Sequence, residues 1–303
     1  MENIETRKVG IAAGLIKSIG HVPNGLAGLV DHITFGSFTL PPRDGNKEPT
    51  YYFNPVSCAS YNAVGLKNMS LLTFIVEQLI GKRHAFLELK AQGCKTRISL
   101  APLKTGDLKE MLRILLEYWF QIFDLIDEIE VNGACPNHRD EGGRLHDVLS
   151  KDPIALELLM MEGVDCPCPK TIKIAPNTTY ECLETTVRLS IAYGYSTIVS
   201  GNTLLSDTPI DTKGRQHISV PKCGMAGAPL LERALKQAST LSQIISTKSE
   251  THVLPSIIGC GGIMSASDAR YYLAVERCTT VQIATYYMEY SVRGLQDLVA
   301  SIM

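Results

Sequence analysis

Long apolar runs and an excess of charge of one sign are both missing from this sequence. No apolar run approaches the ~20 residues of a membrane-spanning helix, and residues 1–10 lack the apolar core of a signal peptide. The net charge of −2 gives no electrostatic reason to bind nucleic acid or an anionic membrane. We therefore expect a cytoplasmic protein that uses neither as a partner.

Motifs for disulfides, clusters and metals are missing as well. The nine cysteines include no Cys-x-x-Cys motif, and the only close pair is Cys166 and Cys168. This usage indicates reduced thiols rather than a disulfide framework or an iron–sulfur cluster. The seven histidines show no His-Glu-x-x-His or similar spacing, so we predict no metal site.

Short β-rich runs alternate with longer helical patterns along the chain. Most of the runs are nearly continuous in apolar residues, which is typical of parallel strands buried on both faces. The expected strands are Lys8–Ala12, His32–Phe38, Thr96–Leu100, Ile126–Val131, Thr171–Ala175, Ser196–Ser200, Val253–Ile258 and Thr280–Ala284. The expected helices lie at 24–30, 71–80, 108–122, 153–161, 180–193, 228–245, 269–274 and 288–302. This alternation predicts a single domain, residues 1–303, folded as a closed (β/α)₈ barrel, with a doubly wound open sheet as the alternative.

Two helix starts carry capping signals. Asp107 with Glu110, and Ser265 with Asp268, resemble capping boxes ahead of apolar periodic segments. Three long stretches, 40–69, 135–149 and 204–226, are expected to be irregular. Each follows a predicted strand, so all three should lie over one end of the barrel, where long loops are usually functional.

Glycines cluster after the seventh predicted strand, where Gly259, Gly261 and Gly262 fall within four residues. Such a loop lets backbone amides approach an anion, and the helix that starts near Ser265 adds its positive end. The loops after strands seven and eight are the usual phosphate site in barrels. We predict phosphate binding here; tight turns without a ligand are the alternative.

Residues 128–137 read Glu-Ile-Glu-Val-Asn-Gly-Ala-Cys-Pro-Asn and run from a strand into a loop. Pro136 has no N–H group to continue the ladder, so Cys135 is expected at the strand end, where α/β proteins place active sites. There the thiol can be a nucleophile, a proton donor or acceptor, or a passive loop residue. Lys173 lies between two isoleucines in a core strand and should point into the barrel.

These motifs, in this order, resemble those of the dihydroorotate dehydrogenases, which are FMN-dependent (β/α)₈ barrels. The resemblance covers nearly the whole chain, through segments 12–17, 35–46, 62–68, 132–137, 172–176, 202–203, 224–227, 258–263 and 281–285. It implies a pyrimidine-biosynthesis oxidoreductase that converts dihydroorotate to orotate on a CH–CH bond. A base removes one proton while hydride leaves the neighbouring carbon for flavin N5.

The resemblance also implies roles for individual residues. It makes Cys135 the base, with a reference pKa of about 8.5 that suits proton abstraction near neutral pH. It places Lys173, the second catalytic residue, beside flavin N1 and O2. The implied substrate-binding residues are Lys17, Asn62, Gly65, Leu66, Asn132, Asn137 and Asn202. The implied FMN-binding residues are Ala12, Ala13, Gly14, Ser37, Asn132, Lys173, Gly224, Gly227, Gly261, Gly262, Ala284 and Thr285.

The chain mixes two classes of that family. Cys135 is typical of the soluble, cysteine-using class, whereas Gly36 and residues 12–17 resemble the membrane-linked class. The electron acceptor therefore stays open among fumarate, a quinone, and NAD reached through a partner subunit, and a homodimer is one possible assembly. Three alternatives remain: an FMN enzyme for another dihydropyrimidine or an enone, a phosphosugar isomerase or aldolase barrel, and a non-catalytic flavin-binding protein.

Overall fold

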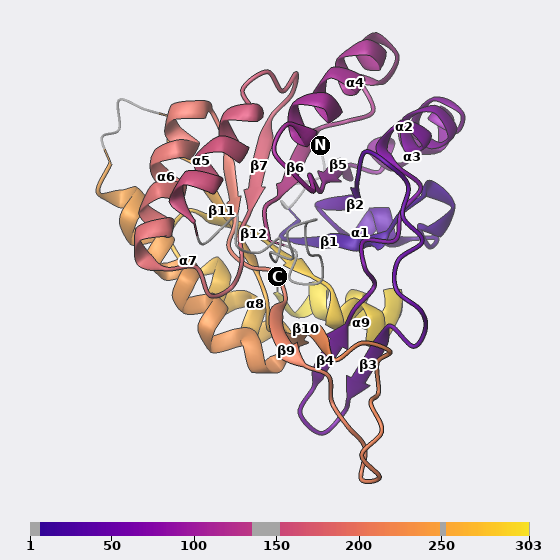
Figure 1. Ribbon diagram of the computed structural model, residues 1–303, viewed down its shortest axis with the longest axis vertical. Helices are drawn as coiled ribbons and strands as arrows, with labels where there is room; N and C mark the ends of the chain where they lie inside the picture. Colours follow the sequence, from indigo (N-terminus) through magenta and orange to yellow (C-terminus); the bar gives the residue numbers. More distant parts are fainter. Residues whose placement is uncertain (1–6, 135–151, 249–252, 303) are drawn as a thin grey trace.

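The computed structural model describes residues 7–134, 152–248 and 253–302, and its centre is a closed barrel of eight parallel strands (Figure 1). All eight predicted barrel strands are confirmed, with ends that differ by a few residues. Around the barrel the order is β1 (Val9–Ile16), β12 (Cys278–Ile283), β11 (Ser256–Cys260), β8 (Thr197–Val199), β7 (Lys170–Lys173), β6 (Glu128–Asn132), β5 (Lys95–Leu100) and β2 (His32–Phe38). The fold is therefore the predicted (β/α)₈ barrel rather than an open sheet.

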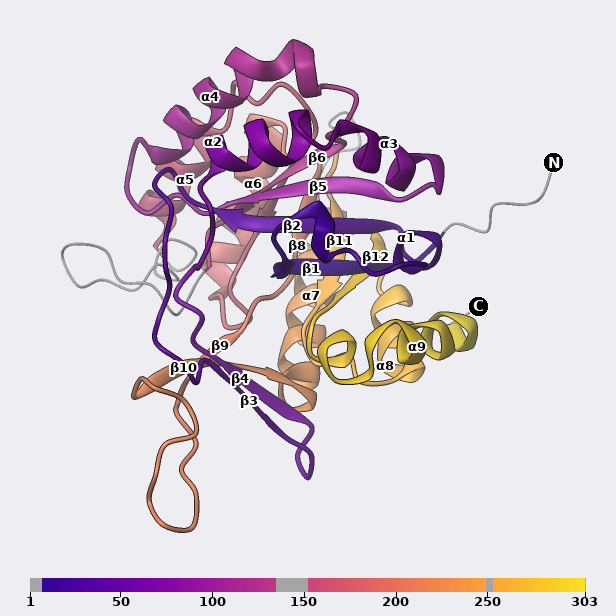
Figure 2. The same ribbon diagram turned by 90° about the vertical axis from the view of Figure 1, so that its right-hand side faces the viewer.

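Helices surround the barrel on its outside (Figures 1 and 2). They are α1 (Leu26–Leu29), α2 (Leu71–Thr73) with a π-helical continuation (Phe74–Ile80), α3 (Arg83–Ala91), α4 (Asp107–Ile122), α5 (Pro153–Glu162), α6 (Tyr180–Tyr193), α7 (Leu231–Ser246), α8 (Ala266–Leu273) and α9 (Thr285–Ile302). Short 3₁₀ turns lie at Ile19–His21 and Ala228–Leu230. Helix α3 was not predicted. In the part of the chain that the structure describes, no helix has both the length and the hydropathy that crossing a bilayer requires.

The two capping predictions have different outcomes. At the start of α8, Ser265 Oγ accepts a hydrogen bond from the Asp268 amide at 3.2 Å, so this cap is confirmed. At the start of α4 the prediction is wrong, because Gly106 is the N-cap residue and Asp107 already belongs to the helix. The Asp107 carboxylate instead accepts from the amide of Leu103, at 2.9 Å, in the preceding turn.

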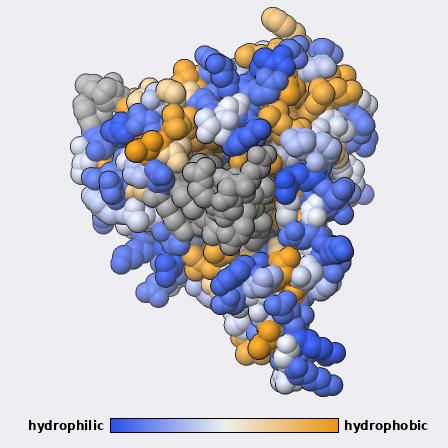
Figure 3. Space-filling view, in the orientation of Figure 1, coloured by the Kyte–Doolittle hydropathy of each residue, from blue (hydrophilic) through white to orange (hydrophobic). Residues whose placement is uncertain are grey.

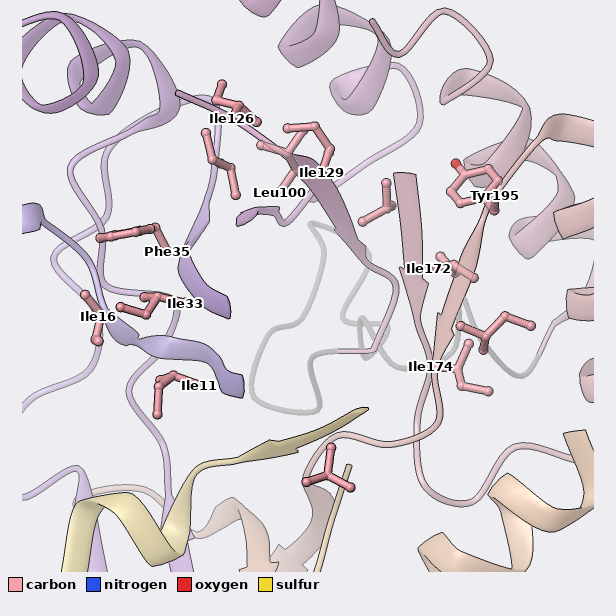
Figure 4. Packing of buried hydrophobic residues seen from close by; sticks show 14 of the residues in the cluster. Ile11, Ile16, Ile33, Phe35, Leu100, Ile126, Ile129, Ile172, Ile174 and Tyr195 are labelled. Atoms are coloured by element: carbon pink, nitrogen blue, oxygen red, sulfur yellow. The ribbon is translucent and has the colours of Figure 1, made fainter. Parts of the chain in front are cut away.

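The barrel strands alternate apolar and polar side chains, although continuous apolar runs were expected. Ile33, Ile129 and Ile172 belong to the large apolar cluster that packs strands against helices (Figure 4). The intervening positions carry polar side chains that are equally buried, such as Glu130 and Gln282. Strands β6 and β12 lie on opposite sides of the ring, yet these two side chains are hydrogen-bonded. Glu130 and Gln282 therefore face the barrel interior, which contains hydrogen-bonded polar side chains.

A second, antiparallel sheet corrects the expectation that residues 40–69 and 204–226 are irregular. Its strands, in spatial order, are β3 (Tyr51–Asn54), β4 (Ala59–Asn62), β10 (Lys222–Gly227) and β9 (Leu204–Asp207). Figure 2 shows this sheet beside the barrel, with the connection between β9 and β10 projecting away from it. Tyr51 Oη donates to Glu289 Oε1 at 2.7 Å, and this bond ties the sheet to α9.

The outer surface shows hydrophilic residues over most of the face in Figure 3, with apolar residues between them. The most exposed apolar side chains include Val56 at 95% and Phe120 at 91% of their accessible surface. Single exposed apolar residues are ordinary on a protein surface.

Candidate active site

A cavity of about 310 Å³ lies at the C-terminal ends of the barrel strands. Asn132 and Lys173 are the last residues of β6 and β7, and both line it. The turn after β11 contributes Gly261 and Gly262, and the start of α9 contributes Thr285. Functional sites of (β/α)₈ barrels are at this end, and the small antiparallel sheet adds further lining residues.

The cavity gathers most of the residues predicted from the sequence. Those that line it are Ala12, Ala13, Gly14, Lys17, Ser37, Asn62, Gly65, Leu66, Asn132, Lys173, Asn202, Gly227, Gly261, Gly262, Ala284 and Thr285. Gly224 does not line it; this residue pairs with Asn62 and Leu205 inside the small sheet. Cys135 and Asn137 lie outside the described residues.

Two amide side chains are fixed against each other on one wall of the cavity. Asn132 Nδ2 donates to Ser37 Oγ at 3.0 Å, and Ser37 Oγ lies 2.8 Å from Ser99 Oγ. Asn202 Nδ2 donates to Asn132 Oδ1 at 3.2 Å and also to the Ala134 carbonyl. These bonds hold both amides in set orientations and secure the backbone after β6 as far as Ala134.

Glycines form another wall, where the backbone itself lines the cavity. Gly262 has a φ of +80°, and a Cβ there would lie 2.3 Å from the Leu231 backbone. Gly227 has a φ of +84°, and a Cβ there would lie 2.2 Å from the Cys58 carbonyl oxygen. Helix α9 begins beside them at Thr285, and the first amides of a helix have no intrahelical acceptor. This wall can therefore bind an anion through backbone amides.

The electrostatics of the cavity favour anionic ligands. Its described lining contains Lys17, Lys67 and Lys173 but no aspartate, glutamate or histidine. Burial, and then the charge of Lys67, lowers the pKa of Lys17, so the two ammonium groups are close enough to repel each other. An anion bound between them would relieve that repulsion.

Lys173 rises into the cavity from a polar interior that sequence reasoning missed. The predicted inward orientation of Lys173 is confirmed: its Nζ donates to Gln282 Oε1 at 3.2 Å and lies 3.8 Å from Glu130 Oε1. The signal for Glu130 was available, because a strand alternates faces and Glu128, Glu130 and Asn132 follow at intervals of two. Other lining residues that sequence reasoning missed include Tyr51, Ser60, Lys67 and Thr203.

Comparison with known proteins agrees with this geometry. The family model Dihydroorotate dehydrogenase matches residues 6–297. The dihydroorotate dehydrogenase (quinone) of Roseiflexus sp. (strain RS-1) is 24% identical over 267 residues, which are 88% of this chain and 68% of that protein. The enzyme of the same name from Alkalilimnicola ehrlichii is 26% identical over 276 residues, which are 88% of this chain and 74% of that protein.

A solved structure shows the same fold. The Eimeria tenella DHODH in complex with ferulenol superposes with a TM-score of 0.73 at 16% identity, covering 97% of this chain and 80% of that one. The match of the family model extends over almost the entire sequence, including every strand of the barrel and all the described residues that line the cavity. The chain therefore belongs to the dihydroorotate dehydrogenase family and is an oxidoreductase that acts on CH–CH bonds.

Proposed function

We propose that the protein oxidises dihydroorotate to orotate in this cavity, with FMN as the hydride acceptor. The observation that supports this most directly is the combination of groups that line the cavity. Glycine turns beside a helix start suit a phosphate, and neutral amides and lysines line the same cavity. A flavin mononucleotide and an anionic pyrimidine need this combination.

The residues present fit FMN. Gly227, Gly261, Gly262 and the start of α9 would hold the phosphate through backbone amides. Lys173 would lie at the pyrimidine edge of the ring system, where a cation stabilises the negative charge that develops on reduction. The first βα turn has no Gly-x-Gly-x-x-Gly fingerprint for a dinucleotide, which favours FMN over FAD or a nicotinamide. A bound flavin would supply the hydride acceptor, its N5 atom.

The substrate would be recognised mainly by neutral groups and one or more cations. Asn62, Asn132 and Asn202 carry amide donors and acceptors that match the alternating N–H and C=O groups of a pyrimidine dione. Lys17 would pair with the carboxylate of dihydroorotate. The backbone amides of Gly65 and Leu66, which have φ values of +71° and +56°, are further candidates for that carboxylate.

Cys135 is proposed as the base that takes the substrate proton. Its motif and the character of the described lining both support this role. Burial raises the pKa of the Cys260 thiol, and burial followed by the hydrogen bond to Glu289 raises the pKa of Tyr51. Both groups therefore stay protonated at neutral pH, which makes them poor bases.

The electron acceptor that regenerates the oxidised flavin is proposed to be a quinone. The relatives in Roseiflexus and Alkalilimnicola carry that acceptor in their names. Reoxidation by a soluble quinone, fumarate or NAD, measured side by side on the reduced protein, separates the three acceptors.

Anaerobic bleaching of the flavin tests the proposed reaction. The purified protein should show the visible absorption band of an oxidised flavin, and dihydroorotate should bleach this band and release orotate. Cys135→Ala should keep its flavin but bleach roughly 10²–10⁴-fold more slowly, because only the proton acceptor is lost. A protein that binds no added FMN would contradict the cofactor. A bound flavin that dihydroorotate never bleaches would contradict the substrate, and equal bleaching rates would contradict the role of Cys135.

A further inference from the structure

A hydrogen-bonded group of side chains lies in the barrel interior directly beneath Lys173. Gln282 is at its centre: the side-chain Oε1 accepts from Lys173 Nζ at 3.2 Å, and Nε2 donates to Glu130 Oε2 at 3.0 Å. Lys173, Glu130 and Gln282 are 4%, 0% and 1% exposed. Three strands, β7, β6 and β12, supply these side chains, so the barrel itself fixes their separation.

The orientation of the Gln282 amide follows from its neighbours. An ammonium only donates and a carboxylate only accepts, so the amide oxygen must face Lys173 and the amide nitrogen must face Glu130. Gln282 Nε2 also lies 3.2 Å from His32 Nε2, whose other ring nitrogen lies 2.8 Å from Asp31 Oδ2. A neutral His32 that donates to Asp31 and accepts from Gln282 satisfies every one of these contacts.

Glu130 is the negative charge nearest to Lys173 among the described residues. Its Oε1 has no hydrogen-bond donor in the described chain and lies 3.8 Å from Lys173 Nζ. The other acidic side chain on the inner face of β6 is Glu128. Its carboxylate accepts hydrogen bonds from Arg97 and Thr171 instead of contacting Lys173. In a region closed to water, the charge of Glu130 is only weakly screened. It therefore offsets the charge of Lys173 at the floor of the cavity.

We propose that Glu130 and Gln282 are positioning residues that hold the Lys173 ammonium at the cavity floor, and that the charge of Glu130 lowers the reduction potential of the flavin bound above it. This inference rests on the proposed function, because it needs a flavin next to Lys173. Two-electron reduction adds negative charge to the flavin, which Lys173 stabilises and Glu130 opposes. Partial neutralisation of Lys173 keeps the reduced flavin a strong enough reductant to pass electrons on.

The test compares reduction potentials of the flavin in charge-changing variants. Glu130→Gln removes the charge with little change in shape and should raise the potential. We expect the preference for reduced over oxidised flavin to grow about tenfold, which is about 30 mV for a two-electron couple. Glu130→Asp keeps the charge and should stay close to the parent. Glu128→Gln makes the same change one step deeper in the barrel, beside Arg97, and should shift the potential less than Glu130→Gln.

The outcomes separate this inference from the proposed function. A parent protein without flavin overturns both. If dihydroorotate bleaches the flavin of the parent and Glu130→Gln has the same reduction potential as the parent, only the role of Glu130 is overturned. The same conclusion follows if Glu130→Asp shifts the reduction potential as much as Glu130→Gln does. If Glu130→Gln does not fold, Gln282→Glu places a second carboxylate against Lys173. At pH 9 that variant should have a lower potential than the parent, and an unchanged or higher one overturns the inference.

Discussion

At the scale of single residues, the cavity is defined by which charges are present and which are not. The three lysines that line the cavity lie at two different places. Lys173 is buried at the cavity floor, whereas Lys17 and Lys67 lie close to each other on the wall. The glycine wall needs no side-chain charge to bind a phosphate. Lys17 and Lys67 are therefore free to pair with the substrate carboxylate, and Lys67 was not identified from the sequence.

Replacement of Lys67 tests this assignment. Lys67→Gln removes one of the two cations and should weaken orotate binding about three- to tenfold, a modest loss because the side chain is exposed to solvent. The loss should shrink at high salt, which screens exposed charges. Perturbation of the flavin spectrum by orotate measures the affinity, with Lys236→Gln on α7 as the control. Equal affinities in the two variants at low salt would refute a role for Lys67.

At the scale of elements, the turns after the barrel strands carry the site, and their backbone geometry is as specific as their side chains. The turn after β11 presents Gly261 and Gly262 with φ values of +118° and +80°. Residues with a side chain rarely adopt this backbone conformation. At Gly262 the neighbouring α7 also leaves no room for a Cβ atom. The motif predicted this turn correctly because the glycines themselves are the signal.

A methyl group at Gly262 should therefore damage flavin binding before it damages the barrel. Gly262→Ala forces the turn away from Leu231 and should weaken FMN binding by about tenfold or more, since the phosphate amides move with it. The dissociation constant, measured by titration of the apoprotein with FMN, checks this. Gly20→Ala is the matched control, because a Cβ at Gly20 meets no atom within 4 Å and its φ is ordinary. Parent-like affinity in Gly262→Ala would argue against phosphate binding at this turn.

The elements that sequence reasoning missed share a physical cause. The strands of the small sheet are only four to six residues long, so β3 and β4 are too short to show a periodic apolar pattern. Helix α3 buries only Phe86 and Leu89, which is too few positions to define a stripe. Barrel strands, in contrast, bury most of their residues and were all found. Tertiary packing, rather than local pattern, determines the missed elements.

At the scale of the whole molecule, the alternation of apolar and polar residues in the strands gives the barrel a charged interior. Glu130 and Gln282 were overlooked because the strands were interpreted as nearly continuous apolar runs, although the alternation of faces along β6 and β12 places both on the inner face. The motif segments located the cavity, but the support beneath it depends on contacts between strands far apart in sequence. A sequence alone does not show which inner residues of opposite strands meet.

The same interior makes the stability of the molecule depend on pH through His32. Burial, and then the charge of Arg97, lowers the pKa of His32 from 6.5 to about 4 in the folded protein. Between these values the unfolded chain binds a proton that the folded protein excludes, so stability is lost as pH falls from about 6.5 to about 4. The pKa of Asp31 is lowered from 3.8 to about 2, mainly by His32 and Lys95 against the opposing effect of burial, and this adds a further loss below pH 4.

Substitution of His32 should remove the first of these two losses. The shift of His32 corresponds to roughly 3 kcal/mol of unfolding free energy between pH 7 and pH 4. His32→Asn removes the titrating ring. At pH 7 the variant should have a lower free energy of unfolding than the parent, because it lacks the packing and hydrogen bonds of the imidazole. That value should then fall less steeply toward pH 4, and the gap between variant and parent should narrow. Urea denaturation at half-unit steps from pH 7 to pH 4 measures both slopes. Parallel curves would mean that His32 titrates alike in the folded and unfolded chain, and that the buried contact with Gln282 does not keep it neutral.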